Sequence, residues 1–238
     1  MEPQTAEDYY NLAHKLRDSN FTKDYRANRD KAIQYIDQAI QLDPENIKYY
    51  LERAAITDAD DEYDYGNDDW TKVIEISQDI EVLKRAHRSR STSYTYARAE
   101  QHMAADLTWL IDRNFADDSI YVLRGNYWYR AEQFERALED YTKSQELRYT
   151  DPVQLLRGQA LYKLGRYSEA LEAMIPLEFH DNWAEFGVPQ RLHRWRGSAY
   201  CKVGNFQQAL TDFNEALRLT GEAAVEDVAA YIEAHGLA

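Results

Sequence analysis

The feature that most constrains this 238-residue chain is an internal repeat with a period near 34 residues. In three segments, which begin at Gly125, Gly158 and Gly197, the Gly is followed nine positions later by an aromatic residue and twelve positions later by Ala. A second mark, an Asp before a large apolar or aromatic residue, recurs in the later half of the unit, at Asp69, Asp106, Asp140 and Asp212. Alignment on both marks gives six units, with equivalent positions at Ala32, Gly66, Met103, Ala137, Ala170 and Ala209.

Each unit is long enough for two amphipathic helices of about 13 residues joined by a turn, and such a pair cannot bury its apolar faces alone. Successive pairs must therefore stack on one another. The composition agrees, because 44% of the residues are hydrophobic, whereas 9 Gly and 5 Pro are too few for a turn-rich β fold. The sequence predicts an all-α protein with a sizeable core.

The period and the small–aromatic–Ala spacing resemble the tetratricopeptide repeat, a helix-turn-helix unit of about 34 residues. The resemblance implies an all-α, right-handed α-α superhelix, or solenoid, of about six helix pairs plus a C-terminal capping helix. We expect these elements to form a single domain over residues 1–238. The expected repeats are approximately 5–45, 46–79, 80–117, 118–150, 151–189 and 190–221, with the capping helix at 222–235.

Two segments depart from the repeat pattern. The first unit carries extra residues, Asp18 to Arg29, between its two helices. In the fifth unit, Pro176 is expected to interrupt the second helix, because proline lacks a backbone donor and clashes with the preceding turn. The loop that follows, Glu178 to Pro189, contains two aromatic residues that either pack on the repeats or contact a partner.

Charge and cysteine content limit the compartment and the partners. The 42 acidic residues outnumber the 28 basic ones, and the resulting net charge of −14 opposes binding to nucleic acid or to an anionic membrane. Cys201 is the only cysteine, so no internal disulfide can form, which fits a reducing compartment. No segment approaches the roughly 18 apolar residues of a membrane span. We therefore expect a cytoplasmic protein that binds neither nucleic acid nor membrane.

The sequence lacks the motifs of the common enzyme classes. It has no glycine-rich phosphate loop, no His pair at zinc spacing and no nucleophile elbow. An acidic segment at residues 58–69 does not fit a calcium-binding EF-hand loop either. In a loop that starts at Asp60, the positions of the required Gly and Glu hold Tyr65 and Thr71. We expect a non-catalytic protein with no cofactor and no bound metal.

The resemblance also implies a binding surface, because the first helices of tetratricopeptide repeats line a concave groove. Carrying the groove-facing places onto this sequence selects side chains that are basic, tyrosine or amide, with no carboxylate among them. These residues are Arg85, Arg88, Asn126, Tyr129, Arg130, Gln159, Tyr162, Lys163, Arg194 and Lys202. These residues either form an ordinary solvated face or make a surface that suits a peptide or protein segment, above all one that carries carboxylates. The predicted function is a protein–protein interaction scaffold that binds a partner segment in this groove.

An alternative rests on the acidic end of the chain. Residues 1–80 hold 19 acidic and 9 basic side chains, and the acidic ones are densest around the turn of the second unit. The cluster comprises Asp58, Asp60, Asp61, Glu62, Asp64, Asp68 and Asp69. It is either a solvated turn or the contact surface for a basic protein, and in the second case the chain would act as an acidic inhibitor or immunity-type protein.

Overall fold

The computed structural model describes residues 3–17, 25–57, 65–93, 100–177, 188–221 and 233. Within these residues the chain forms twelve helices and no strand. The helices are α1 (Ala6–Arg17), α2 (Tyr25–Leu42), α3 (Ile47–Thr57), α4 (Tyr65–Ile76), α5 (Ile80–Ser93), α6 (Glu100–Asp112), α7 (Asp118–Arg130), α8 (Phe134–Leu147), α9 (Asp151–Lys163), α10 (Tyr167–Met174), α11 (Val188–Lys202) and α12 (Phe206–Thr220).

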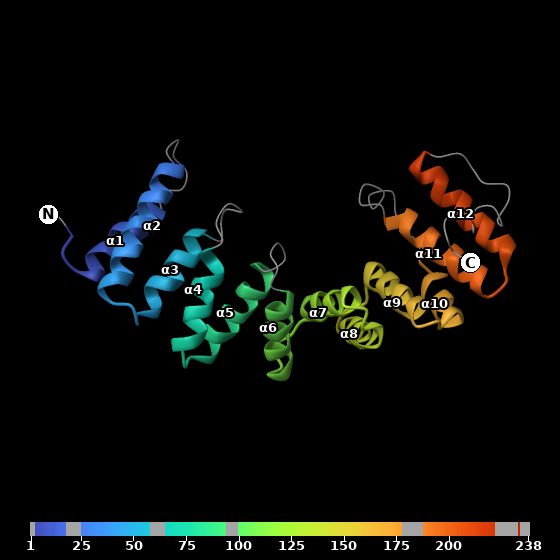
Figure 1. The fold of residues 1–238 in the computed structure, drawn as a ribbon, viewed down its shortest axis with the longest axis horizontal. Coiled ribbons are helices and arrows are strands. Elements are labelled where there is room, and N and C mark those ends of the chain that lie inside the picture. The colour runs from blue at the N-terminus through green and yellow to red at the C-terminus, as the bar shows by residue number, and fades with distance from the viewer. Residues whose placement is uncertain are drawn as a thin grey trace. The chain divides into compact units, whose positions relative to one another are not determined.

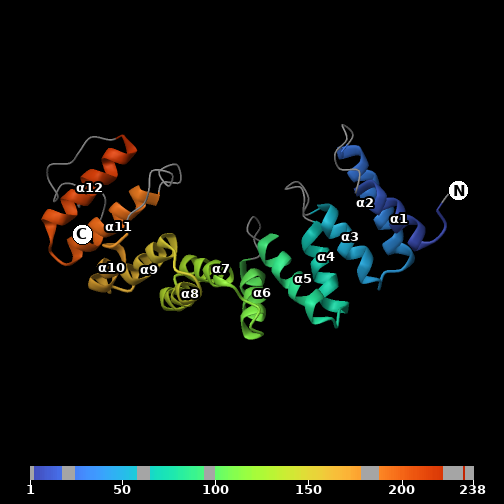
Figure 2. The same ribbon diagram turned by 180° about the vertical axis from the view of Figure 1, so that it is seen from behind.

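The helices divide into two compact units, Met1–Phe115 with α1 to α6 and Ala116–Ala238 with α7 to α12. Within each unit every helix packs against the next one in the chain, as Figure 1 shows. Contacts also skip one helix, since α1 packs on α3 and α9 packs on α11. Figure 2 shows α9, α10 and α11 from behind, where they again lie together. Pairs stacked in this way bury the apolar faces that a single pair leaves open.

The predicted all-α fold of stacked helix pairs is confirmed. Of the extra residues in the first unit, the last five belong to α2, which begins at Tyr25. Helix α10 ends at Met174, two residues before Pro176, as predicted from the proline. The segment 178–187 and nearly all of the expected capping helix at 222–235 lie outside the described residues, and the single domain over residues 1–238 stays a prediction.

A spacing of 16 residues relates the two helices of a pair. In the last three pairs a Gly on the first helix lies against a fully buried side chain 16 positions later: Gly125 on Tyr141, Gly158 on Met174 and Gly197 on Phe213. Ala54 and Trp70, and likewise Ser91 and Leu107, hold the same positions in α3/α4 and α5/α6 and are all buried. A small buried residue on the first helix and a large buried one 16 positions later therefore recur in all five pairs.

The residues just before this small–large contact form an ion pair with the same spacing. Arginines on α3, α5, α7 and α11 each donate through Nε and Nη2 to a buried Asp on the following helix, with N–O distances of 2.6–3.1 Å. The pairs are Arg53–Asp69, Arg90–Asp106, Arg124–Asp140 and Arg196–Asp212. Two of the aspartates also contact a histidine. Nδ1 of His87 lies 2.8 Å from Oδ1 of Asp106, and Nδ1 of His193 lies 2.8 Å from Oδ1 of Asp212. These bidentate contacts give both oxygens of each carboxylate a charged donor.

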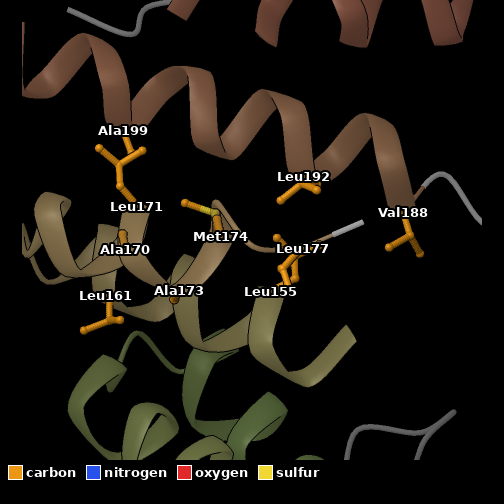
Figure 3. Close-up of a cluster of buried hydrophobic side chains, with 10 residues drawn as sticks. All are labelled: Leu155, Leu161, Ala170, Leu171, Ala173, Met174, Leu177, Val188, Leu192 and Ala199. Carbon is orange, nitrogen blue, oxygen red and sulfur yellow. The ribbon is translucent and has the colours of Figure 1, made fainter. Parts of the chain in front are cut away.

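The best-defined core of the second unit lies where α9, α10 and α11 meet. Figure 3 shows the side chains of Leu192, Val188 and Ala199 on α11 lying over those of α9 and α10. Ala170 and Met174 contribute from α10 and are fully buried. The short helix α10 is held in place by this apolar contact on both of its neighbours.

We predict that Gly197→Ala destabilises the protein. A Cβ at this position would lie 2.7 Å from Cε1 of Phe213, whose ring is fully buried, so one of the two side chains would have to shift. Overpacking of this kind costs about 1–3 kcal/mol, which exceeds the roughly 1 kcal/mol that Ala gains over Gly in a helix. Urea unfolding measures the change, and Phe213→Leu in the Gly197→Ala background should recover part of the loss. A single variant as stable as wild type would contradict the close contact.

We predict that Asp212→Asn lowers the free energy of unfolding by about 3 kcal/mol at pH 7, because it leaves Arg196 without its carboxylate. Burial favours the neutral acid, but hydrogen bonds from Arg196 and His193 outweigh it and lower the pKa of Asp212. A folded-state pKa below the unfolded value gives stability that is present above pH ~4 and is lost as the pH falls through the folded pKa.

The same unfolding experiment at pH 7 and pH 3 tests the ion pair. The difference between wild type and Asp212→Asn should shrink at the lower pH. Glu215→Gln is the control, because Glu215 pairs with the exposed Arg218 and should change stability by less than about 1 kcal/mol. Equal losses in the two variants would mean that the buried pair contributes no more than an exposed one.

Candidate functional site

The candidate binding surface begins with an uneven distribution of charge in the second unit. Its first helices, α7, α9 and α11, contain eight basic and two acidic residues, a net charge of +6. Its second helices, α8, α10 and α12, contain eight acidic and three basic residues, a net charge of −5. Helix α11 has four basic residues and no acidic one. A chain with a net charge of −14 thus concentrates positive charge on one set of helices.

An aromatic and cationic cluster joins α9 to α11. The rings of Tyr162 and Trp195 meet edge to face with centroids 5.2 Å apart, and the rings of Tyr162 and Tyr167 meet edge to face at the same centroid distance. The ammonium group of Lys163 lies 5.8 Å from the Trp195 centroid. Both Tyr162 and Trp195 are half-buried, and burial raises the pKa of Tyr162. The cluster combines aromatic area with an exposed cation, which is the chemistry of a protein contact surface.

Four of the predicted surface residues in the second unit are exposed cations. Arg130 lies at the end of α7, Lys163 at the end of α9, and Arg194 and Lys202 lie on α11. Arg85 and Arg88 are also exposed, but they lie on α5 in the first unit. The Arg85 guanidinium lies 5.5 Å from the ring centroid of Trp70.

The neutral residues of the predicted set are more buried than its cations. Gln159 is only 7% exposed. Asn126 accepts a hydrogen bond of 2.8 Å from the Tyr141 hydroxyl, so its amide oxygen is used inside the pair α7/α8. Tyr129 packs against Phe134, and its hydroxyl is buried without a hydrogen-bond partner. Burial raises the pKa of Tyr129 to about 12. The charged and the neutral residues of the set therefore have different surroundings.

The acidic cluster of the alternative function lies mostly outside the described residues, since 58–64 are not among them. Of the two members that are described, Asp68 is exposed and Asp69 is fully buried. Asp69 accepts hydrogen bonds from Arg53, which also pairs with Asp37 at 2.5 Å. Asp69 is thus a structural residue of the second pair and not part of an acidic surface.

Three further side chains, two on α5 and one on α11, contribute to packing within the units. Arg90, within a basic run on α5, pairs with the buried Asp106. His87 stacks on Trp109 with ring centroids 4.0 Å apart. Cys201 is half-buried, and burial raises the pKa of its thiol, which disfavours the reactive thiolate. In the part of the chain that the structure describes, no helix has the length and apolar character needed to cross a membrane.

Sequence reasoning missed Trp195 and the arginines of the buried pairs. Trp195 follows Arg194 directly and does not occupy one of the positions carried over from the repeat pattern. The ion pairs had a usable signal, because each recurring Asp stands 16 residues after an Arg and one residue before the large side chain. This spacing could have identified Asp69 as buried.

Comparison with known sequences agrees with the repeat pattern. Two models of the tetratricopeptide repeat match, one over residues 190–223 and one over residues 27–46. The chain contains tetratricopeptide repeats. The matched segments include α12 and most of α2, and helix pairs of the same kind lie between them. No curated protein sequence matches the chain significantly.

Solved structures of tetratricopeptide-repeat proteins share the fold. YrrB, a TPR protein with an unusual peptide-binding site, is 16% identical with a TM-score of 0.65, and the match covers 84% of this chain and 97% of YrrB. The C-terminal part of a TPR repeat-containing protein from Cytophaga hutchinsonii is 15% identical with a TM-score of 0.62, covering 89% of this chain and 79% of that one. PilW, a type IV pilus biogenesis factor, is 14% identical with a TM-score of 0.52, covering 97% of this chain and all of PilW. At these identities the likeness concerns the fold.

We predict that Tyr129→Phe stabilises the tetratricopeptide fold by about 1 kcal/mol, because it removes a buried hydroxyl that lacks a hydrogen-bond partner. Tyr141→Phe is the matched control: its hydroxyl donates to Asn126, so its removal should lower stability by about 1 kcal/mol. Chemical denaturation measures both variants. A loss of stability in Tyr129→Phe as large as in Tyr141→Phe would show that the Tyr129 hydroxyl has a partner after all.

Proposed function

We propose that this protein is a non-catalytic interaction scaffold that binds an acidic peptide segment of a partner on the first helices of its second unit. The tetratricopeptide fold supports the general role, because proteins with this repeat generally serve as protein-binding scaffolds. The observation that carries the specific proposal is the net charge of +6 on α7, α9 and α11 beside a net charge of −5 on their partner helices.

The proposed contact residues are the exposed cations and the half-buried aromatic pair. Lys163, Arg194 and Lys202 would pair with carboxylates of the segment, and Trp195 with Tyr162 would supply the apolar contact. Trp, Tyr and Arg are the side chains that most often dominate binding energy when water is excluded around them. Positive charge on these helices would also steer an acidic segment toward them and speed association at low salt.

The cysteine content is the basis for a proposal about the compartment. We propose that the protein works in the cytoplasm, since its single thiol, Cys201, has no second cysteine in the chain to pair with.

A peptide library displayed on phage and selected on the wild-type protein tests the proposal. We expect the selected peptides to be enriched in Asp and Glu with interspersed apolar residues, and to bind more weakly as salt is raised. Lys163→Glu and Trp195→Ala should each lower the affinity of a selected peptide at least tenfold by calorimetry, about 1.4 kcal/mol or more.

Lys143→Glu is the matched control, because it makes the same charge change on the second helix α8, where Lys143 is exposed. It should leave the affinity within about twofold, less than 0.5 kcal/mol. Selected peptides without acidic enrichment, or equal losses in Lys143→Glu and Lys163→Glu, would reject the proposed surface.

A further inference from the structure

One helix pair breaks the pattern of buried ion pairs. The fifth pair has an arginine at the expected place, Arg157 on α9, but the residue 16 positions later on α10 is Ala173. Among the described pairs from α3 to α12, the other four have an Asp at that position. Arg157 thus occupies the position of the arginine in the repeat but lacks the Asp carboxylate that the other four arginines pair with.

The guanidinium of Arg157 is only partly satisfied within the protein. Its Nη1 donates to Oε1 of Gln154 at 2.8 Å, but the other four arginines contact their Asp through Nε and Nη2. Its Nε is buried and has no hydrogen-bond partner. In the other four pairs Nε donates to the Asp carboxylate at 2.8–3.1 Å. A buried donor on a charged group that lacks its acceptor is costly, so the site favours any acceptor that can reach it.

A pocket of about 330 Å³ lies at this position, between α8, α9 and α10. Arg157 and Ala173 both line it, so the space left by the missing side chain is part of the pocket. Its volume is at the lower end of the range for small-ligand sites and is far larger than a single water molecule. None of the residues predicted for the groove lines this pocket. It is a separate place on the second unit.

The charges around the pocket restrict what can enter. Arg166 and Glu169 also line it, and Arg166 donates to both carboxylate oxygens of Glu169 through Nε and Nη2. Glu172 is an exposed carboxylate on the same wall. The two glutamates oppose a highly charged anion such as phosphate. A single carboxylate carries only one negative charge, and its two oxygens can accept hydrogen bonds from two N–H groups of an arginine side by side.

We propose that this pocket is a binding site for a carboxylate, which completes from outside the ion pair that four other helix pairs make within the chain. The ligand accepts hydrogen bonds from Nε and Nη2 of Arg157, in the place that an Asp side chain at position 173 would occupy. The carboxylate comes either from an acidic side chain of a partner protein or from a small organic acid. The site shares helix α9 with the surface proposed above, but none of the contact residues proposed for that surface lines it.

Titration followed by NMR of the arginine Nε–H signals tests the proposal. The probes are sodium acetate, the capped tripeptide Gly-Asp-Gly and the capped tripeptide Gly-Asn-Gly, with sodium chloride at equal ionic strength. We expect the Arg157 Nε–H signal to shift with saturation for acetate and Gly-Asp-Gly, and not for Gly-Asn-Gly or chloride. Tighter binding of Gly-Asp-Gly identifies a protein side chain as the ligand, whereas tighter binding of acetate identifies a small acid.

Two variants separate the site from a general effect of carboxylates. Ala173→Asp supplies the carboxylate from within the chain, so it should raise the thermal midpoint and reduce the saturable shift at least tenfold, whereas Ala173→Asn should do neither to the same degree. Arg157→Gln removes the guanidinium and should abolish binding of Gly-Asp-Gly, observed by ligand NMR. A shift that does not saturate, a shift retained in Ala173→Asp, or Gly-Asp-Gly binding retained in Arg157→Gln would overturn the proposal.

Discussion

The packing of a glycine against a large residue 16 positions later determines how the two helices meet in each of the last three pairs, α7/α8, α9/α10 and α11/α12. The close approach of Gly197 to Phe213 brings the backbones together at one crossing point. Adjacent residues on a helix point about 100° apart. The Arg and Asp that precede this contact therefore meet beside it and not within it. A slip of one residue would place a Cβ against the ring and separate the ion pair in the same step, so the two contacts specify one register.

This arrangement also explains how an acidic protein keeps a basic surface. Each buried pair places one positive charge on a first helix and one negative charge on a second helix, and the two charges compensate each other inside the pair. Without the pairs Arg124–Asp140 and Arg196–Asp212, the helices α7, α9 and α11 keep a net charge of +4 (+6 minus 2), and α8, α10 and α12 keep −3 (−5 plus 2). The excess of positive charge on α7, α9 and α11 is carried by other side chains, of which Lys163 and Arg194 are exposed. The buried pairs contribute to the packing of the helices, whereas Lys163 and Arg194 take no part in them. Stability and recognition are thus assigned to different residues of the same helices.

The sequence predicted the fold well because small and large residues recur at fixed positions of the repeat. Gly158 and Ala170 mark close approaches, and periodic apolar residues mark the buried faces. The candidate site was predicted less well. Exposed cations such as Lys163 follow directly from helical position, but the inward placement of Gln159 and Tyr129 depends on which neighbour fills the space beside them. Asp69 was misassigned to a surface because a count of acidic residues ignores the Arg that one of them faces.

The fifth pair separates the contributions of packing and charge. Helices α9 and α10 keep the register through Gly158 and Met174, although Ala173 removes the ion pair. The small–large contact is therefore sufficient to position the helices, in agreement with the modest net stability that buried ion pairs provide over apolar residues. An arginine that is not needed for register and lacks an acceptor at Nε is a liability to the fold, which an uncharged residue at position 157 would remove. Its presence beside an open pocket is accounted for by an acceptor from outside the chain.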